Sequence, residues 1–575
     1  MKRNQLTFRI RLLSVVIILV GLLLICRLYQ LQVLQTEDYV ARAESQYVHT
    51  KTDLYSRGSI LFTARDGSTL SAAAIQSGYT LAANPEHITS STEDFCRELS
   101  SFMLAETDES TCVARLSTPG RTYAELATRL TKEQADEIEA KTINGAMLYK
   151  NQWRYYPGGS LAARSIGFVG FTDDGSELRG KYGLERQYDD ILFQKRQVLS
   201  VNFFAELFSN LGELVYKKEG NRTGDVVTTL EPSVSRMLDM VLQETNDLYS
   251  SKLTGAIVMN PKTGEIIAMN VVPSFDLNDR SGATVEHFQN PLVENVYEFG
   301  STIKALTMAA GLDSGAVSSQ STYYDAGAIE LDGFPIRNFD NRGRGTVSMQ
   351  EVLNQSLNTG VSHIVQQMGK ERFRDYFLGY KLGSETGIDL PNEVHGLVDN
   401  LSSPRDVEYA TASFGQGIAM TPIEAIRALA TLGNGGKLVT PHLVKRIEYD
   451  DGEVKEVRYP DGEQVLRKET SEEISRMLTT VVDKALKHGT VALPNHTIGA
   501  KTGTAQIADP VNGGYYDDKF LHSFFGYFPA FDPEFIIFMY TVEPKGVQYA
   551  SETLTDPFME ITKFLINYYS IPPDR

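Results

Sequence analysis

The sequence predicts a mixed α/β (α+β) protein whose main domain is built on one mostly antiparallel sheet flanked by helices. Two strand patterns separated by a turn occur at 256–259 and 266–269. Three more return only near the end of the chain, at 498–507, 523–528 and 535–542. Helical periodicity and glycine-rich turns fill the stretch between them. We therefore expect the two distant groups of strands to pair with each other in one sheet.

Length and composition restrict the classes of protein that this chain can be. Its 575 residues leave room for more than one domain, and 42% hydrophobic with 22% charged residues is ordinary for a globular protein. A formal net charge of -18 argues against a nucleic-acid-binding protein. The sequence contains neither His-Glu-x-x-His nor Cys-x-x-Cys, so we predict no metal site and no cofactor.

The N-terminus carries a signal for membrane insertion. Residues 12–26 are free of charge, no acidic residue precedes Glu37, and four basic residues come first: Lys2, Arg3, Arg9 and Arg11. This predicts a cytoplasmic tail over 1–11, a transmembrane anchor and the start of a stalk over 12–34, and an extracytoplasmic remainder. A cleaved signal peptide is the rival reading, but the small-x-small pattern at 41–43 lies far beyond the apolar run.

The stretch from 35 to 230 reads as a non-catalytic pedestal module. It mixes helical patterns such as 131–140 with strand-like ones such as 226–230, and its topology does not follow from the pattern. Cys96 and Cys112 lie in this module and, given the predicted topology, in an oxidising compartment. They either form a disulfide or remain free and buried.

The chemistry of the chain centres on Ser301-Thr302-Ile303-Lys304, the one Ser-x-x-Lys in the sequence. It precedes apolar residues with helical spacing, and residues three apart share one helix face, so the Lys304 amine can reach the Ser301 hydroxyl. A serine becomes a good nucleophile when a neighbouring base takes its proton. Lysine is such a base when burial or a nearby cation lowers its pKa.

Two further motifs follow in order, Ser356-Leu357-Asn358 and Lys501-Thr502-Gly503-Thr504. Each also has a copy upstream of Ser301: Ser200-Val201-Asn202 and Lys262-Thr263-Gly264. Lys262 follows Asn-Pro between two strand patterns, so its triplet reads as a hairpin turn. Order and context therefore select the downstream copies.

The ordered trio is typical of penicillin-binding proteins and class A β-lactamases. From Gly255 onward the chain resembles the transpeptidase domain of penicillin-binding proteins, and we assign that domain to 231–575. Upstream, Tyr156-Pro157-Gly158-Gly159 and Gly183-Leu184-Glu185 resemble the N-terminal module of the class B proteins. Other stretches that resemble the family are Gly387-Ile388-Asp389-Leu390-Pro391, Phe414-Gly415-Gln416-Gly417 and His522-Ser523-Phe524-Phe525-Gly526. One departure from the family near the nucleophile is Phe299, where proline is usual.

The resemblance implies a role for each residue of the trio. Ser301 would attack the carbonyl between two D-alanines of a peptidoglycan stem peptide, with Lys304 as general base. The Ser301 and Thr504 backbone N–H groups would stabilise the oxyanion. Ser356 would relay protons, Asn358 would hold the substrate amide, and Lys501 would add positive potential. The Thr502 and Thr504 hydroxyls would bind the substrate carboxylate, and Gly503 would let the substrate lie against the strand edge.

The resemblance thus implies a membrane-anchored D,D-transpeptidase, a target of β-lactams, that serves cell division or elongation. The layout is more similar to the division-type proteins. A polytopic polymerase of lipid-linked precursors is the implied partner, together with other cell-wall assembly proteins. Two alternatives remain open, a β-lactamase that hydrolyses its acyl-enzyme quickly and a catalytically idle scaffold.

Overall fold

The computed structural model describes residues 56–103, 108–173, 177–194 and 222–575. They form two compact units, a smaller one of Gly78–Gln152 and a larger one that combines Ser56–Ser77 with Trp153–Arg575. The predicted tail and anchor over 1–34 and the triplet at 200–202 lie outside the described residues. Within the described ranges, no helix is both long and apolar enough to cross a membrane.

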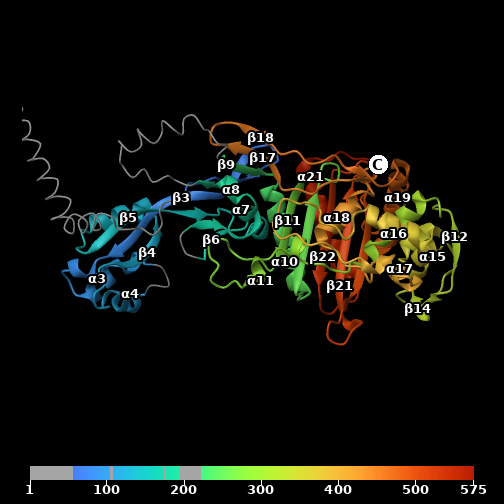
Figure 1. Cartoon of the computed structure of the whole chain (residues 1–575), viewed down its shortest axis with the longest axis horizontal. Helices are drawn as coiled ribbons and strands as arrows, with labels where there is room; N and C mark the ends of the chain where they lie inside the picture. The colour runs from blue at the N-terminus through green and yellow to red at the C-terminus, as the bar shows by residue number, and fades with distance from the viewer. Residues whose placement is uncertain (1–55, 104–107, 174–176, 195–221) are drawn as a thin grey trace, which may run out of the picture. The chain divides into compact units, whose positions relative to one another are not determined.

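The larger unit is built on a five-stranded antiparallel sheet in the order β11-β10-β22-β21-β20. Its strands are β10 (Leu253–Met259), β11 (Ile266–Val272), β20 (Gly499–Ala508), β21 (Tyr515–Phe528) and β22 (Phe535–Val542). All five predicted strands are confirmed, and so is the pairing of the early hairpin with the late strands through β10 and β22 (Figure 1). β20 stands at the edge of the sheet.

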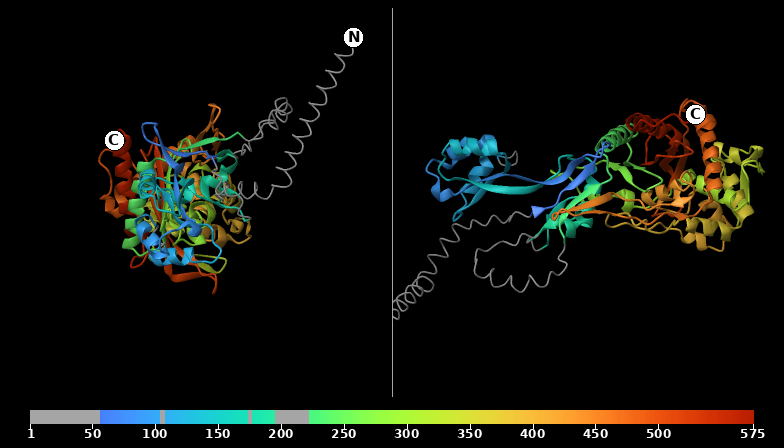
Figure 2. Two further views of the ribbon diagram at one scale, coloured as in Figure 1. Left: turned by 90° about the vertical axis from the view of Figure 1, so that its left-hand side faces the viewer. Right: turned by 90° about the horizontal axis from the view of Figure 1, so that it is seen from above.

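Both faces of this sheet are buried. Successive residues of a strand point to opposite faces, and Phe524 accordingly joins a different hydrophobic cluster from Phe525. Helices α10 (Pro232–Leu248) and α21 (Thr555–Tyr569) cover the Phe524 face. After α21 the chain turns back, and Arg575 forms an ion pair with Asp483 at 2.7 Å. This contact holds the end of the chain, marked C in Figure 2, against the larger unit.

Helix α13 (Lys304–Asp313) lies on the other face and is buried along nearly its whole length. An α-helix that is apolar all round belongs in the interior of a large domain. Around it pack α15 (Asn358–Met368), α16 (Lys370–Gly379), α18 (Pro422–Ala430) and α19 (Lys468–Thr480). Because α13 packs against both the sheet and these four helices, the residues at its N-terminus have little freedom to move.

A second sheet of the larger unit joins segments from distant parts of the chain. β9 (Gly224–Thr228) pairs in parallel with β2 (Ile60–Thr63) and antiparallel with β17 (Val444–Tyr449). β17 continues to β18 (Val454–Glu456), and β2 to the first half of β3 (Thr69–Ala83). The residues just before β2 therefore lie beside a strand that immediately precedes α10.

A buried ionic network stands next to this second sheet. The Glu185 side chain is fully buried and accepts from Arg57 Nε at 2.7 Å and from Arg154 Nε at 2.6 Å. Arg57 also reaches Asp189 at 2.7 Å, and the Tyr156 hydroxyl donates to Glu185 at 3.3 Å. The upstream stretches that resemble the family in sequence thus meet around a single carboxylate.

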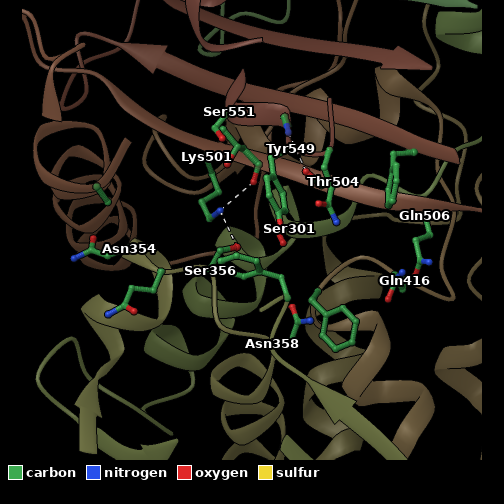
Figure 3. Close-up of a pocket in the computed structure, with 18 of the residues that line it drawn as sticks. Ser301, Asn354, Ser356, Asn358, Gln416, Lys501, Thr504, Gln506, Tyr549 and Ser551 are labelled. Carbon is green, nitrogen blue, oxygen red and sulfur yellow. Dashed lines mark hydrogen bonds between the residues drawn. The ribbon is translucent and has the colours of Figure 1, made fainter. Parts of the chain in front are cut away.

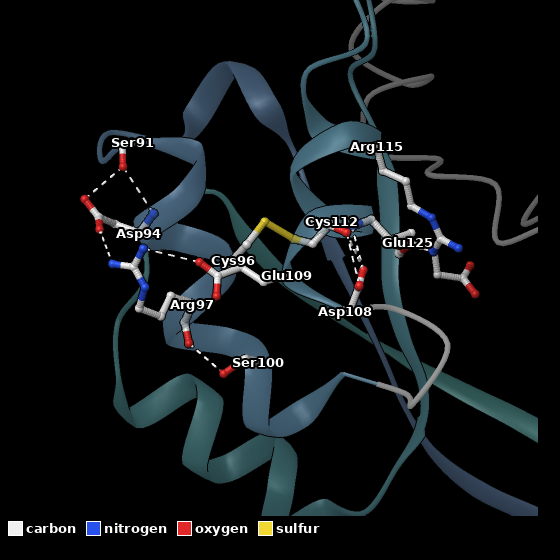
Figure 4. The surroundings of a disulfide bond; sticks show 12 residues. Ser91, Asp94, Cys96, Arg97, Ser100, Asp108, Glu109, Cys112, Arg115 and Glu125 are labelled. Carbon is white, nitrogen blue, oxygen red and sulfur yellow. Dashed lines mark hydrogen bonds and ion pairs between the residues drawn. A yellow bond between two sulfur atoms is a disulfide. The ribbon is translucent and has the colours of Figure 1, made fainter.

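The smaller unit contains the second half of β3, β4 (Ala124–Leu130) and the main part of β5 (Ala146–Tyr155). Its helices are α3 (Thr92–Leu99), α4 (Glu109–Leu116) and α5 (Lys132–Ala140), the last as predicted. Cys96 of α3 and Cys112 of α4 form a disulfide, which decides between the two alternatives for these cysteines (Figure 4).

Candidate active site

Ser301 lies in the short helix η4 (Gly300–Thr302), immediately before α13. Gly300 has φ = 61°, and a Cβ on it would lie 2.6 Å from the carbonyl oxygen of Thr504. Its N–H donates to the carbonyl of Gly415 at 3.2 Å. Only glycine fits such a close approach with a left-handed backbone, so the turn that carries Ser301 is fixed between β20 and the loop at Gly415.

Gly503 gives the same turn its second contact with β20. A Cβ on Gly503 would lie 2.4 Å from both Phe299 O and Ser523 Oγ. The structure therefore gives this glycine a role besides the expected one, because it makes room for the serine turn. Phe299 itself is buried in an edge-to-face contact with Phe538 at 4.8 Å, so the departure from proline is accommodated by the core.

Lys304 and Lys501 converge on Ser356, as Figure 3 shows for Lys501. The fully buried Lys304 Nζ donates to the Ser356 carbonyl at 2.5 Å and to Ser356 Oγ at 3.2 Å. Lys501 Nζ donates to Ser356 Oγ at 3.1 Å and to Thr502 O at 3.0 Å. The Lys304 amine thus bonds to Ser356 rather than to Ser301, although the two residues of the motif are one helical turn apart.

Both amines are shifted toward the neutral form. Burial, and then the neighbouring charge of Lys501, hold the pKa of Lys304 well below its usual value. Burial lowers the pKa of Lys501 to about 7. Within the described part of the chain, neither lysine forms an ion pair that would offset its burial. A buried neutral amine next to two serines has the properties of a general base.

Ser356 lies in the connection between α14 (Met349–Asn354) and α15, and Asn358 is the first residue of α15. Ser356 has φ = 52°, a conformation that few non-glycine residues adopt. Asn358 opens α15 and donates from Nδ2 to the carbonyl of Arg337 at 2.7 Å. Strained backbone of this kind concentrates at functional sites, because the surrounding structure has to hold it.

A cleft of about 830 Å³ opens in front of these residues. Six of the predicted site residues line it: Ser301, Ser356, Asn358, Lys501, Thr502 and Thr504. Sequence reasoning missed Gln506, Tyr549 and Ser551, which also line it (Figure 3). Gln506 lies two residues after Thr504 on the same strand, so strand periodicity points to it. No sequence signal marks Tyr549 or Ser551.

The upstream Lys-Thr-Gly lies elsewhere, in the turn between β10 and β11. Gly264 has φ = 87°, and Lys262 Nζ pairs with Asp532 at 2.5 Å. Lys262 is not among the residues that line the cleft. The prediction of a hairpin turn is confirmed.

Two family models match the chain. The model described as the penicillin binding protein transpeptidase domain matches residues 254–562. The model described as the penicillin-binding protein dimerisation domain matches residues 55–205. Together the two matches include all eight predicted site residues and the carboxylate of the buried ionic network.

Individual relatives agree with these models. The chain is 31% identical to stage V sporulation protein D of Bacillus subtilis over 441 residues, 75% of this chain and 66% of the relative. It thus spans just under two thirds of that relative's length. It is 27% identical to a peptidoglycan D,D-transpeptidase FtsI homolog of Mesostigma viride, over 96% of this chain and 94% of the relative. The apo crystal structure of penicillin binding protein 3 from Mycobacterium tuberculosis superposes with a TM-score of 0.64 at 26% identity, covering 74% and 92% of the two chains.

Proposed function

Because the chain belongs to the class B penicillin-binding proteins, we propose that it is a serine D,D-transpeptidase that cross-links peptidoglycan stem peptides through an acyl-enzyme. One observation carries this proposal. Ser301 borders a large cleft, and behind it the buried amine of Lys304, whose pKa is strongly lowered, is hydrogen-bonded to Ser356. This combination is what a serine needs to form an ester with a peptide carbonyl at neutral pH.

In the proposed first step, Ser301 Oγ attacks the carbonyl between two D-alanines and its proton passes to Lys304 Nζ. The N–H groups of Ser301 and Thr504 stabilise the oxyanion. Collapse breaks the peptide bond, and the leaving D-alanine nitrogen receives a proton through Ser356. An amine of a second stem peptide then attacks the ester carbonyl. A new amide forms as the bond to Ser301 Oγ breaks, and the proton that the amine loses returns to Ser301 through Lys304. Lys304 turns from Ser356 to Ser301 when substrate binds, since catalytic hydrogen bonds often form only in the complex.

The remaining site residues bind the substrate in this proposal. Asn358 holds the substrate amide, Thr502 and Thr504 bind the terminal carboxylate, and Lys501 supplies positive charge beside it. A bound carboxylate favours the charged form of Lys501 over the neutral one. Gly503 acts indirectly, by letting β20 approach the turn of Ser301.

Labelling with fluorescent penicillin tests this function. We expect the full chain to form a stable labelled band that Ser301→Ala abolishes and that the control Ser403→Ala, at a half-buried position that does not line the cleft, leaves intact. A band that disappears within minutes would indicate a β-lactamase, and the absence of label on the wild-type protein would indicate an idle scaffold.

We also propose the predicted membrane topology and partners. The basic residues before the apolar run support an anchor over 12–34, with the pedestal (35–230) and catalytic domain (231–575) outside the cytoplasm. The two family matches fall on either side of that domain boundary, which supports it. A division-type role and a partner polymerase follow from the family resemblance. Protease added to spheroplasts should digest most of the chain, and full protection would contradict this topology.

A further inference from the structure

His522 is a fully buried histidine on β21 that faces Thr504 across the ladder of the sheet. Both of its ring nitrogens have partners. Nε2 lies 3.0 Å from the carbonyl oxygen of Gln548, and Nδ1 lies 2.9 Å from Thr553 Oγ1. A carbonyl can only accept, so Nε2 carries a hydrogen, and in the neutral ring Nδ1 is then the acceptor. The Thr553 hydroxyl can donate to it at 2.9 Å, in preference to its longer contact of 3.3 Å with the Ala550 carbonyl. Burial lowers the pKa of His522 to about 4, which keeps the ring neutral.

The two partners of His522 belong to a segment that forms one wall of the cleft. Gln548, Tyr549, Ala550 and Ser551 all line it, and α20 (Ala550–Thr553) ends at the threonine that His522 holds. The imidazole thus bonds to this segment at both ends, once through a backbone carbonyl and once through a side chain. It fixes the wall relative to β20 and β21 without reaching the cleft itself.

The wall in turn orients the Thr504 hydroxyl, because Ala550 N–H donates to Thr504 Oγ1 at 3.1 Å (Figure 3). With an oxygen lone pair occupied in this way, the hydroxyl hydrogen is free to point to an acceptor in the cleft. A carboxylate is the strongest acceptor that a substrate can offer there, since hydrogen bonds to charged groups are the stronger ones.

We propose that His522 is a positioning residue for recognition of the substrate carboxylate, which it controls by holding the 548–553 segment against Thr504. The inference rests on the proposed function, because it assigns the Thr504 hydroxyl to the carboxylate end of the substrate. It separates two tasks in the site. Ser301 and Lys304 carry out the chemistry, and the bonds from His522 through Ala550 to Thr504 select for the charge of the substrate.

The test compares acylation by benzylpenicillin and by its methyl ester, which lacks the carboxylate charge. In the His522→Leu variant we expect the ratio of the two acylation rate constants to fall about tenfold, the effect of losing one hydrogen bond to a charged group. The ester reaction should change less, because Ser301 and Lys304 are untouched. His442→Leu is the matched control, since His442 is buried and stacked 3.7 Å from Tyr459 but does not line the cleft.

Two conservative variants separate positioning from folding. His522→Gln can still donate to Gln548 O, and His522→Asn can still accept from Thr553. The ratio of acylation rate constants should therefore lie, in each of these variants, between the wild-type value and the value for His522→Leu. If His522→Leu does not fold, the proposal requires that these two variants fall below the wild-type ratio.

A wild-type ratio in the folded His522 variants, or an equal loss in His442→Leu, would overturn the inference. Failure of the proposed function looks different, because an idle scaffold would react with neither compound and a β-lactamase would lose its acyl label within minutes.

Discussion

Two clusters of buried charge in the larger unit are built on opposite plans. Around Glu185, two guanidinium groups face carboxylates at 2.6–2.7 Å, so each charge has an opposite partner. Around Ser356, the amines of Lys304 and Lys501 converge on a hydroxyl, and among the described residues no carboxylate forms an ion pair with either of them. The side chains at the centre of each cluster are buried: Glu185 and its two arginines in one, Lys304 and Lys501 in the other.

Burying a charge costs free energy in both clusters, but the two clusters offset this cost in different ways, and the difference decides whether the cluster is structural or reactive. A compensated cluster keeps its charges and connects segments of the pedestal, which makes it a structural device. An uncompensated cluster gives up its protons, and the amines become bases at neutral pH. Buried lysines without an oppositely charged partner therefore indicate the reactive site. Buried arginines paired with carboxylates indicate a structural contact between segments of the chain. The following four predictions test this contrast.

Removal of Glu185 should have the largest effect. Glu185→Leu leaves Arg57 and Arg154 buried without their shared carboxylate, and we expect a loss of about 3–5 kcal/mol in the free energy of unfolding. Glu472→Leu, which breaks an exposed pair with Lys468, should cost at most about 1 kcal/mol. Urea unfolding measures both. Equal effects of the two variants would show that the Glu185 ion pairs do not stabilise the fold more than an exposed pair does.

Replacement of Lys304 should have the opposite signature. In Lys304→Met, acylation by benzylpenicillin should fall about 10²-fold or more, which corresponds to about 2.7 kcal/mol in activation free energy. The free energy of unfolding should stay the same or rise, because an uncompensated buried amine is replaced by an apolar chain of similar length. Normal acylation by the folded variant would contradict the role of Lys304 as the base.

The effect of replacing Lys501 on the free energy of unfolding should depend on pH. The pKa of Lys501 is about 7 in the folded chain, against an ordinary value of about 10.4, so between these limits the unfolded state binds more protons. The free energy of unfolding of the wild type therefore rises with pH in this window. We expect the stability advantage of Lys501→Met to be largest below pH 7 and to shrink by about 2 kcal/mol by pH 9. An advantage that does not vary with pH would indicate that Lys501 remains charged.

The other Lys-Thr-Gly should show almost no effect. Lys262 forms an exposed pair with Asp532, and Lys262→Ala should change the free energy of unfolding by no more than about 0.5 kcal/mol. Its acylation rate should equal that of the wild type, whereas Lys501→Met should be slower. A slow Lys262→Ala together with a fast Lys501→Met would show that the wrong triplet has been assigned to the cleft.

The five-stranded sheet could be predicted from sequence because each of its strands is an apolar run bounded by turn residues. The structure extends β21 back to Tyr515, well before the predicted start at 523. Residues 515–520 are mostly polar, and a polar hairpin arm gives no hydrophobic pattern to find. The topology of the pedestal was not predictable, since strands such as β9 pair with segments far away in the chain.

The site was predictable where a motif fixes the residue types, as for Ser301 and Lys501. Helical spacing places Lys304 on the same face as Ser301. It does not predict that the Lys304 amine donates a hydrogen bond to the hydroxyl of Ser356 in the folded chain. Tyr549 and Ser551 reach the cleft through the tertiary placement of a segment that has no local pattern. The boundary between 230 and 231 stays a prediction.

The pairing of β10 with β22 also has a consequence during synthesis. Gly255 lies opposite Tyr540, so the sheet closes only after residue 540 has left the ribosome. β20 carries Lys501 and Thr504 and has no neighbour in the sheet except β21, which itself needs β22. Contacts this far apart in sequence form late and slowly. We therefore expect a chain that ends before residue 535 to contain Ser301, Lys304 and Ser356 without the completed sheet that positions Lys501 and Thr504 opposite them.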